Sequence, residues 1–296
     1  MKTKGSGATG LALPIAAVIC AMLGFQIGAT LAKQLFHDVG PEGAATLRLT
    51  FGAAMLIGVV RPWRNWPRPA PLVPLLGLGL STAAAILMFF EALNRLPQGM
   101  VVALQFLGPL SIAIFGSRRA VDLIWAILAG SGVWLLVGSG LAGGPIDPVG
   151  VAWALGAGAG WAGYILFGRA VSASFGASTA GLALVVAAVL VAPIGLQHSG
   201  AALFNPALLP LALLVALVST ALPFTLEFYA MPRMPARTFA VILSLEPAFG
   251  AMTGFLLLHE RLSLAQIAGV AAVIAAAAGA AWSTGASDEG AEATAV

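Results

Sequence analysis

Apolar segments of about 20 residues recur along the chain, and that length is what a helix needs to cross a bilayer. Only 8% of the 296 residues are charged, against about 25% in soluble domains, so lipid must solvate most of the surface. The pattern predicts an all-α membrane protein of ten transmembrane helices: 11–33, 42–60, 71–93, 98–116, 121–141, 148–169, 177–196, 207–230, 236–257 and 263–283.

The two ends of the chain differ from these segments. Residues 1–10 are predicted to be a cytoplasmic tail, and the apolar run that follows is too long for a cleaved signal peptide. Residues 284–296 are rich in Ser, Gly, Ala and acidic residues, which favours a disordered cytoplasmic tail.

Lysine and arginine in the loops set the orientation, because cytoplasmic loops carry an excess of both. With the N-terminus inside, three loop cations are outside, at Lys33, Arg95 and Arg261. Ten are inside: Lys2, Lys4, Arg61, Arg64, Arg68, Arg118, Arg119, Arg169, Arg233 and Arg237. An even number of spans then places both termini in the cytoplasm.

A repeated element relates the two halves of the chain. Arg95-Leu96-Pro97 and Arg233-Met234-Pro235 are each followed twelve residues later by a proline, Pro109 or Pro247, at an offset of 138 residues. Five helices per half, 11–141 and 148–283, would insert the second half upside down. Inverted repeats of this kind are common in transporters, whose substrate sites lie near the midplane between the halves.

Glu246 is the strongest candidate for a functional residue. It lies in Ser244-Leu245-Glu246-Pro247, near the middle of the ninth predicted span, where a charge is costly. Pro247 should kink the helix and free a carbonyl beside the carboxylate. The two groups could bind an ammonium group or carry a proton; alternatively, a neutral Glu246 is hydrogen-bonded within the bundle.

Three other charged residues lie within predicted spans. Glu227, one turn after the kink-forming Pro223, could act in coupling or pair with Arg233 or Arg237 at the inner boundary. Arg48 could receive a substrate carboxylate or extend to the outer surface. Glu91, four residues before Arg95, favours a boundary salt bridge with that arginine.

Neutral polar and aromatic residues complete the candidate site. Gln26 and Gln105 could line a cavity or join helices by hydrogen bonds. Trp161 and Tyr164 lie near one face of the sixth span together with Trp153 and Phe167. That face could form an aromatic cavity wall, or it could pack against a neighbour with help from the small Gly156 and Gly160.

Enzyme chemistry is not indicated. The histidines His37, His198 and His259 are too dispersed for a metal site, and a lone Cys20 excludes an internal disulfide. No catalytic residue, metal or cofactor is predicted. No basic run favours nucleic acid, and no ATP-binding motif is present, so a gradient of protons, another ion or the substrate must supply the energy.

Several short stretches resemble the drug/metabolite transporter superfamily, with paired EamA domains, and within it the bacterial threonine/homoserine exporters. They include Leu47-Arg48-Leu49, Gly108-Pro109, Ser219-Thr220-Ala221-Leu222-Pro223, Arg237-Thr238-Phe239 and Glu246-Pro247-Ala248. The resemblance covers nearly the whole chain. It implies proton-driven efflux of small neutral amino acids across the bacterial inner membrane. Gln105 departs from the pattern, since these exporters have a Glu there.

Two alternatives stay open at this stage. The cargo could be aromatic compounds, drugs or other metabolites, which an aromatic wall on the sixth span would favour. A membrane-embedded enzyme would need a catalytic constellation across facing spans.

Overall fold

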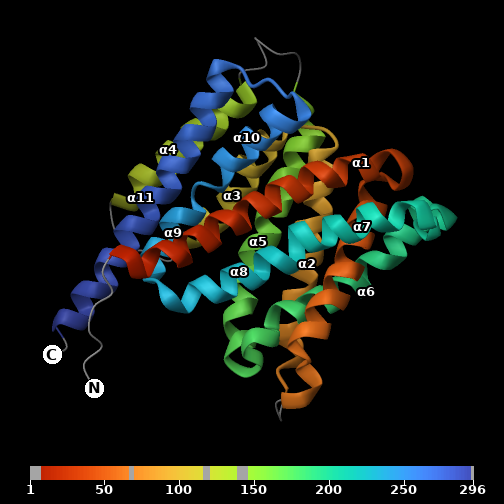
Figure 1. Cartoon of the computed structure of the whole chain (residues 1–296). Coiled ribbons are helices and arrows are strands. Elements are labelled where there is room, and N and C mark those ends of the chain that lie inside the picture. The colour runs from red at the N-terminus through yellow and green to blue at the C-terminus, as the bar shows by residue number, and fades with distance from the viewer. Residues whose placement is uncertain (1–7, 67–69, 116–120, 139–145, 295–296) are drawn as a thin grey trace.

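The computed structural model describes residues 8–66, 70–115, 121–138 and 146–294. Every regular element in these ranges is a helix, and none of the described residues forms a strand (Figure 1). The chain is therefore an all-helical protein, as predicted.

The first element, α1 (Ala8–Val60), is a helical hairpin with its bend at Gly40 (Figure 1). Gly40 has φ 66° and ψ 174°, a conformation that glycine adopts without steric cost, and Pro41 restarts the helix. The predicted connection over 34–41 is therefore wrong in detail, because all of it except Gly40 is helical. Pro14 also lies inside this element.

Ten further helices follow α1 in the described residues. They are α2 (Leu72–Leu93), α3 (Gln98–Phe115), α4 (Val121–Gly138), α5 (Pro148–Phe175), α6 (Thr179–Ser199), α7 (Leu209–Ala216), α8 (Leu222–Ala230), α9 (Ala236–Leu243), α10 (Glu246–Leu258) and α11 (Leu264–Thr294). Short 3₁₀ segments lie at Pro62–Asn65, Gly176–Ser178, Gly200–Phe204, Pro206–Leu208 and Met231–Arg233.

Two predicted spans are interrupted. The predicted span 207–230 contains α7 and α8, which are joined by a π-helical turn over Leu217–Ala221. The predicted span 236–257 contains α9 and α10, and its helix breaks at Ser244 and Leu245. Each interruption lies shortly before a proline, Pro223 or Pro247, which supplies no N–H to the helical ladder.

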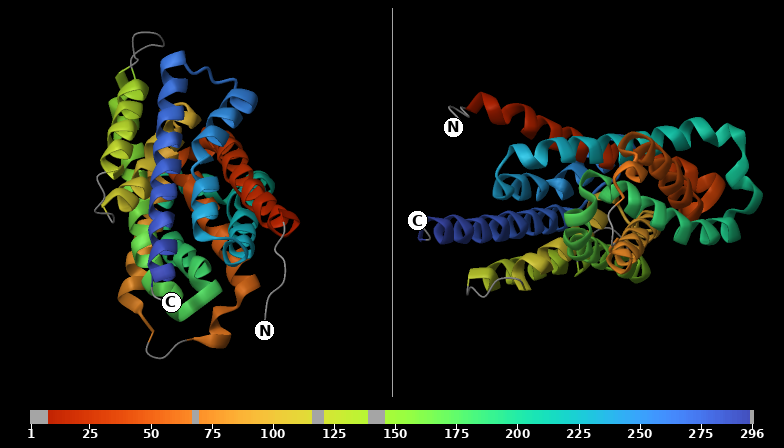
Figure 2. Two further views of the ribbon diagram at one scale, coloured as in Figure 1. Left: turned by 90° about the vertical axis from the view of Figure 1, so that its left-hand side faces the viewer. Right: turned by 90° about the horizontal axis from the view of Figure 1, so that it is seen from below.

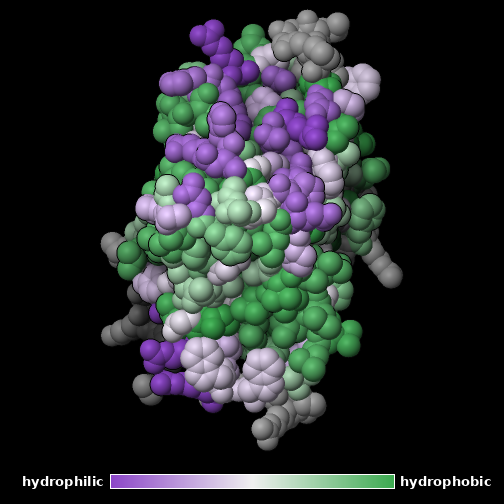
Figure 3. Space-filling view, turned by 90° about the vertical axis from the view of Figure 1, so that its right-hand side faces the viewer, coloured by the Kyte–Doolittle hydropathy of each residue, from purple (hydrophilic) through white to green (hydrophobic). Residues whose placement is uncertain are grey.

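By length and composition, seven helices of the described residues can cross a membrane. The first of them, Leu11–Val60, is 50 residues long and contains the bend at Gly40, and two shorter apolar helices cover Gln98–Ile112 and Leu123–Val137. Large apolar side chains on the outside include Leu72, Val73, Leu76, Leu80, Val189, Phe255 and Leu256. In Figure 3 hydrophobic residues cover the lower middle of one face, with hydrophilic residues above and at the lower edge. The protein is thus a multi-pass membrane protein.

Small residues bring the helices of the bundle close together. The main packing partners are α2 with α5, α1 with α6, α4 with α11, and α3 with both α5 and α10. A Cβ on Gly108 would overlap the Gly158 carbonyl, and a Cβ on Gly160 would lie 2.6 Å from the Ala85 nitrogen. The glycines of α5 therefore allow neighbouring helices to approach closely.

The start of α1 and the end of α11 lie at the same end of the molecule (Figures 1 and 2). The helix α11 extends to Thr294, so residues 284–294 of the predicted disordered tail are helical. Ala and Glu are good helix formers, so an existing helix can propagate through this composition. Residues 1–7 of the predicted N-terminal tail and the loop residues Arg68, Arg118 and Arg119 lie outside the described residues, whereas residues 8–10 of that tail belong to α1.

Candidate functional site

A cavity of about 310 Å³ lies inside the bundle. Its lining includes seven residues identified from the sequence: Gln26, Arg48, Gln105, Trp161, Tyr164, Glu227 and Glu246. They come from α1, α3, α5, α8 and α10, so elements of both halves of the chain meet around one space. The volume is at the small end of the range for small-molecule sites, about 300–1,000 Å³.

Arg48 is held inside the bundle and does not extend to the surface. Its Nη2 donates to the Ser219 carbonyl at 3.0 Å, and its Nε donates to Thr220 Oγ1 at 3.3 Å. Its Cζ lies 5.5 Å from the centre of the Phe90 ring. The side chain is 5% exposed, so the surface alternative for this arginine is wrong.

Pro223 explains why the Ser219 carbonyl can accept a hydrogen bond from Arg48. In a regular helix the Ser219 carbonyl would accept from the N–H of residue 223, and proline has none. The π-helical turn over Leu217–Ala221 further changes the pattern of backbone hydrogen bonds here. The freed carbonyl is therefore available to the guanidinium, which has more donors than these two bonds use.

Glu246 is the first residue of α10, after the break in the predicted ninth span. Gln26 Nε2 donates to its Oε1 at 3.1 Å, across from α1. The N-terminus of a helix stabilises negative charge, so this position suits a carboxylate better than the middle of an unbroken helix would. The carboxylate faces the cavity together with Arg48 and Glu227.

Glu227 also lines the cavity, from α8. The alternative pairing with Arg233 is wrong, because that guanidinium donates to the Tyr229 carbonyl and lies 4.0 Å from the Tyr229 ring centre. The side chain of Arg237 lies outside the described residues.

Arg95 does not pair with Glu91, and the prediction of that salt bridge is wrong. Arg95 Nη1 instead contacts Asp147 Oδ2 at 3.1 Å, because Asp147 caps the start of α5 and faces it. The Val149 backbone N–H and the Arg95 guanidinium together hold the pKa of the exposed Asp147 carboxyl below its ordinary value. Glu91 lies beside Glu42.

The predicted aromatic face of α5 is divided between two surroundings. Trp161 and Tyr164 line the cavity, with ring centres 5.4 Å apart. Phe167 is 40% exposed on the outside, and Trp153 packs against the core. Further aromatic residues reach the cavity from other helices: Phe25, Phe89, Phe106, Phe224 and Phe239.

The two glutamines differ in their surroundings. Gln26 is 2% exposed and bonded to several groups, whereas Gln105 Oε1 is buried and has no hydrogen-bond partner among the described residues. Pro109 also lines the cavity, one turn after Gln105, within an unbroken α3.

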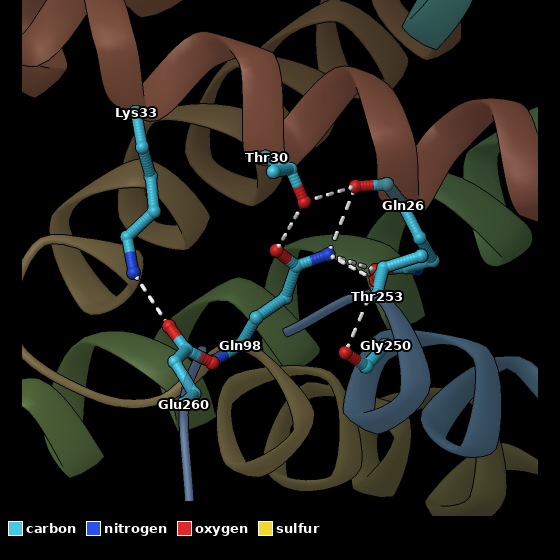
Figure 4. Close-up of polar contacts among 7 residues, drawn as sticks. All are labelled: Gln26, Thr30, Lys33, Gln98, Gly250, Thr253 and Glu260. Carbon is cyan, nitrogen blue, oxygen red and sulfur yellow. Dashed lines mark hydrogen bonds and ion pairs between the residues drawn. The ribbon is translucent and has the colours of Figure 1, made fainter. Parts of the chain in front are cut away.

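A buried network beside the cavity was not identified from the sequence (Figure 4). Gln98, at the start of α3, bonds to Gln26, Thr30 and Thr253 from two other helices. Gln98 was missed because a glutamine directly after a turn is typical of a helix end exposed to water. The sequence signal that could have indicated the network is the spacing of Gln26, Thr30 and Lys33, which places three polar side chains on one face of α1.

Comparison with known proteins identifies relatives along nearly the whole chain. The model of the EamA-like transporter family matches residues 12–138 and 148–282. The chain is 44% identical to the threonine/homoserine exporter RhtA of Salmonella typhimurium and 42% identical to that of Escherichia coli K12, over 90% of each chain. It is 30% identical to the uncharacterized transporter YwfM of Bacillus subtilis, over 79% of this chain and 83% of that protein.

A solved crystal structure shares the fold, with a TM-score of 0.59 at 19% identity over 93% of this chain and 97% of the other. The matched relatives are named as transporters and exporters rather than enzymes. The family model covers both halves of a chain whose apolar helices enclose a cavity with polar and charged residues. This protein therefore belongs to the EamA-like transporter family.

Proposed function

We propose that this protein exports small neutral amino acids such as threonine and homoserine from the cytoplasm. The relatives that are 42–44% identical carry that name. The observation that carries the proposal is the cavity itself, where a buried guanidinium and two carboxylates share one small space. An amino-acid zwitterion has the complementary pair of charges.

The charges of the cavity give each end of a zwitterion a partner. Arg48 is fixed by Ser219 and Thr220, and its remaining donors can bind a substrate carboxylate. Glu246 and Glu227 can accept hydrogen bonds from the substrate ammonium group. Inside a bundle such charge-assisted bonds are stronger than in water, which favours a substrate that is itself charged at both ends.

The transmembrane arrangement is part of the proposal. Counting the two arms of α1 separately and including α3 and α4 as crossings, the protein has ten crossings in two inverted five-helix repeats, 11–141 and 148–283. The positive charge of the inner loops then places both termini in the cytoplasm, in a bacterial inner membrane. The lining from both halves agrees with a site between two repeats.

The energy source is proposed to be the proton gradient. Glu246 would bind a proton in one state of an alternating-access cycle and the substrate ammonium group in the other, so the two would exchange. The break before Glu246 provides a place where α10 can move relative to α9.

Substrate counterflow in proteoliposomes tests the proposal. Vesicles loaded with threonine should accumulate labelled threonine, and external threonine and homoserine should compete. The aromatic side chains of the lining favour a second candidate cargo, aromatic compounds. If aromatic amino acids compete and threonine and homoserine do not, the second candidate replaces the first.

A further inference from the structure

A continuous chain of hydrogen bonds connects the cavity to one end of the bundle, and Figure 4 shows the part of it from Gln26 to Lys33. It begins at Glu246, whose Oε1 accepts from Gln26 Nε2. Gln26 Oε1 in turn accepts from Gln98 Nε2 at 3.0 Å. The Gln98 backbone N–H donates to Glu260 Oε2 at 2.7 Å, and Glu260 Oε1 pairs with Lys33 Nζ at 2.8 Å.

Gln98 is the centre of this chain, and its side chain is fully buried. Its Oε1 accepts from the Thr30 hydroxyl at 3.0 Å, and its Nε2 also reaches Thr253 Oγ1 at 3.0 Å. Gln98 Nε2 also donates to the Gln26 backbone carbonyl at 2.9 Å, and because a carbonyl can only accept, this bond fixes the Gln98 amide with its oxygen toward Thr30. Because its Nε2 then donates to Gln26 Oε1, the Gln26 amide must present its own N–H groups to Glu246.

Three helices lead from the cavity to the network, with α10 packed against both α1 and α3. Each has a cavity residue and a network residue further along: Gln26 and Lys33 on α1, Gln105 and Gln98 on α3, and Glu246 and Thr253 on α10. Gln26 and Lys33 are separated by about 10 Å of helix, at 1.5 Å per residue. The network therefore fills the space between the cavity and that end.

Small residues hold α3 and α10 close enough for the network to form. A Cβ on Gly99 would lie 2.6 Å from the Ala251 Cα, and one on Gly250 would lie 2.8 Å from Val102 Cγ2. Glu260 adds a charge-assisted bond at the start of α3, where the backbone N–H groups lack helical partners. The Lys33–Glu260 pair is only partly buried, so water can reach it when the helices separate.

We propose that Gln98 is a positioning residue that orients Gln26 as a donor to Glu246 and joins that bond to a closing contact, Lys33–Glu260, at the end of the bundle. Release of Gln26 by Glu246 loosens the Gln98 amide and with it the contact among α1, α3 and α10. Under the topology of the proposed function, on which this inference rests, that end faces the outside, so the state of the cavity carboxylate is linked to outer closure.

Thiol labelling from outside tests the closing contact. In a Cys20→Ser background, Ala85→Cys places a thiol on the cavity lining, and an impermeant maleimide is added to right-side-out vesicles. Gln98→Leu should raise the labelling rate roughly tenfold, because it removes the buried hydrogen bonds that join α1, α3 and α10. The control is Thr82→Val, since among the described residues that buried hydroxyl bonds only to the Leu78 carbonyl of its own helix.

A second variant guards against a Gln98→Leu protein that does not fold. Lys33→Met combined with Glu260→Gln removes the ion pair at the partly exposed end and should raise labelling in the same direction. Parental labelling rates in both variants would overturn the proposal. Labelling needs no substrate, so increased labelling without threonine counterflow would refute the proposed cargo only. An increase confined to inside-out vesicles would refute the assignment of this end to the outside.

Transport kinetics test the positioning role. Gln98 does not line the cavity, so Gln98→Leu should lower the maximal rate roughly tenfold while KM changes by less than about threefold. If Gln98 acts through Gln26, then Gln26→Leu with Gln98→Leu should be no slower than Gln26→Leu alone. Multiplicative losses in the double variant would show that the two residues act independently.

Discussion

Arg48 is held by two acceptors in a geometry that suits a planar guanidinium. Its Nε and Nη2 donate to Thr220 and Ser219, which are neighbours in one helical segment. The remaining N–H groups of the guanidinium are left to face the cavity. A lysine ammonium is a single point charge and cannot make both contacts while also binding a carboxylate at two points. The residue therefore combines anchoring with recognition.

Arg48→Lys should leave expression and membrane insertion intact and weaken threonine binding. The loss of one charge-assisted bond predicts an increase in KM of roughly tenfold. Threonine uptake over a range of concentrations, at matched protein levels, measures this. Normal KM in the variant would mean that Arg48 only joins α1 to the segment around Ser219.

Glu246 differs from the other carboxylates of the spans in its position at a helix break beside the cavity. Glu246→Gln mimics the protonated form and keeps the shape, so it should fold, lose gradient-driven export and lose the pH dependence of transport. Glu246→Asp should keep partial function with a shifted pH profile. Glu91→Gln is the matched control, since Glu91 does not line the cavity. Export against pH in vesicles with an imposed proton gradient is the measurement.

A normal rate and a normal pH profile in Glu246→Gln would make Glu246 a packing residue. The coupling group would then be sought at Glu227, which lines the same cavity.

At the scale of helices, the contact between α3 and α5 depends on glycine. Gly108→Ala places a methyl group against the Gly158 carbonyl, where backbone cannot give way easily. Overpacking of this kind costs about 1–3 kcal/mol. Gly130→Ala is the control, because no described atom outside the nearby backbone of its own helix lies within 4 Å of its Cβ position, and alanine gains about 0.5–1 kcal/mol in a helix. Thermal unfolding in detergent should show a lower midpoint for the first variant and an equal or higher one for the second.

Asp147 at the start of α5 gives the fold a pH dependence. Its pKa is lowered in the folded protein, so its contribution to stability is present above its ordinary pKa and is lost as pH falls through the folded value. Asp147→Asn keeps the cap on the Val149 N–H but removes the charge facing Arg95. The wild type should unfold at a higher temperature than the variant at neutral pH. That difference should vanish in strong acid; a difference that persists there would mean the charge is not its source.

Hydropathy predicts where most helices of this protein lie, because the length of an apolar run is a local property of the chain. The bend at Gly40 and the break at Ser244 and Leu245 depend on backbone geometry that hydropathy does not report. The seven candidate site residues stand out as polar or aromatic groups in apolar runs. Gln98 does not, since its role depends on partners 72 and 155 residues away in the chain.

At the scale of the whole molecule, the two ends of the described chain lie together (Figures 1 and 2). The even number of crossings in the proposed topology predicts this, since each crossing moves the chain to the opposite side. In the proposed topology the excess of loop cations lies on the same side, including Arg61, Arg64, Arg169 and Arg233. Because such loops are retained in the cytoplasm during insertion, we expect that side to be the inner one.

Reporter fusions test this orientation. A green fluorescent protein fused after Val296 should fluoresce, because it folds in the cytoplasm, and alkaline phosphatase at the same position should be inactive. Alkaline phosphatase fused after Asn205, in the connection between α6 and α7, should be active, because an odd number of crossings precedes that point in the proposed topology. Activity after Val296 together with inactivity after Asn205 would invert the whole molecule. The Lys33–Glu260 contact would then close the inner end of the cavity, and transport driven by the same carboxylate would be controlled from the cytoplasmic side.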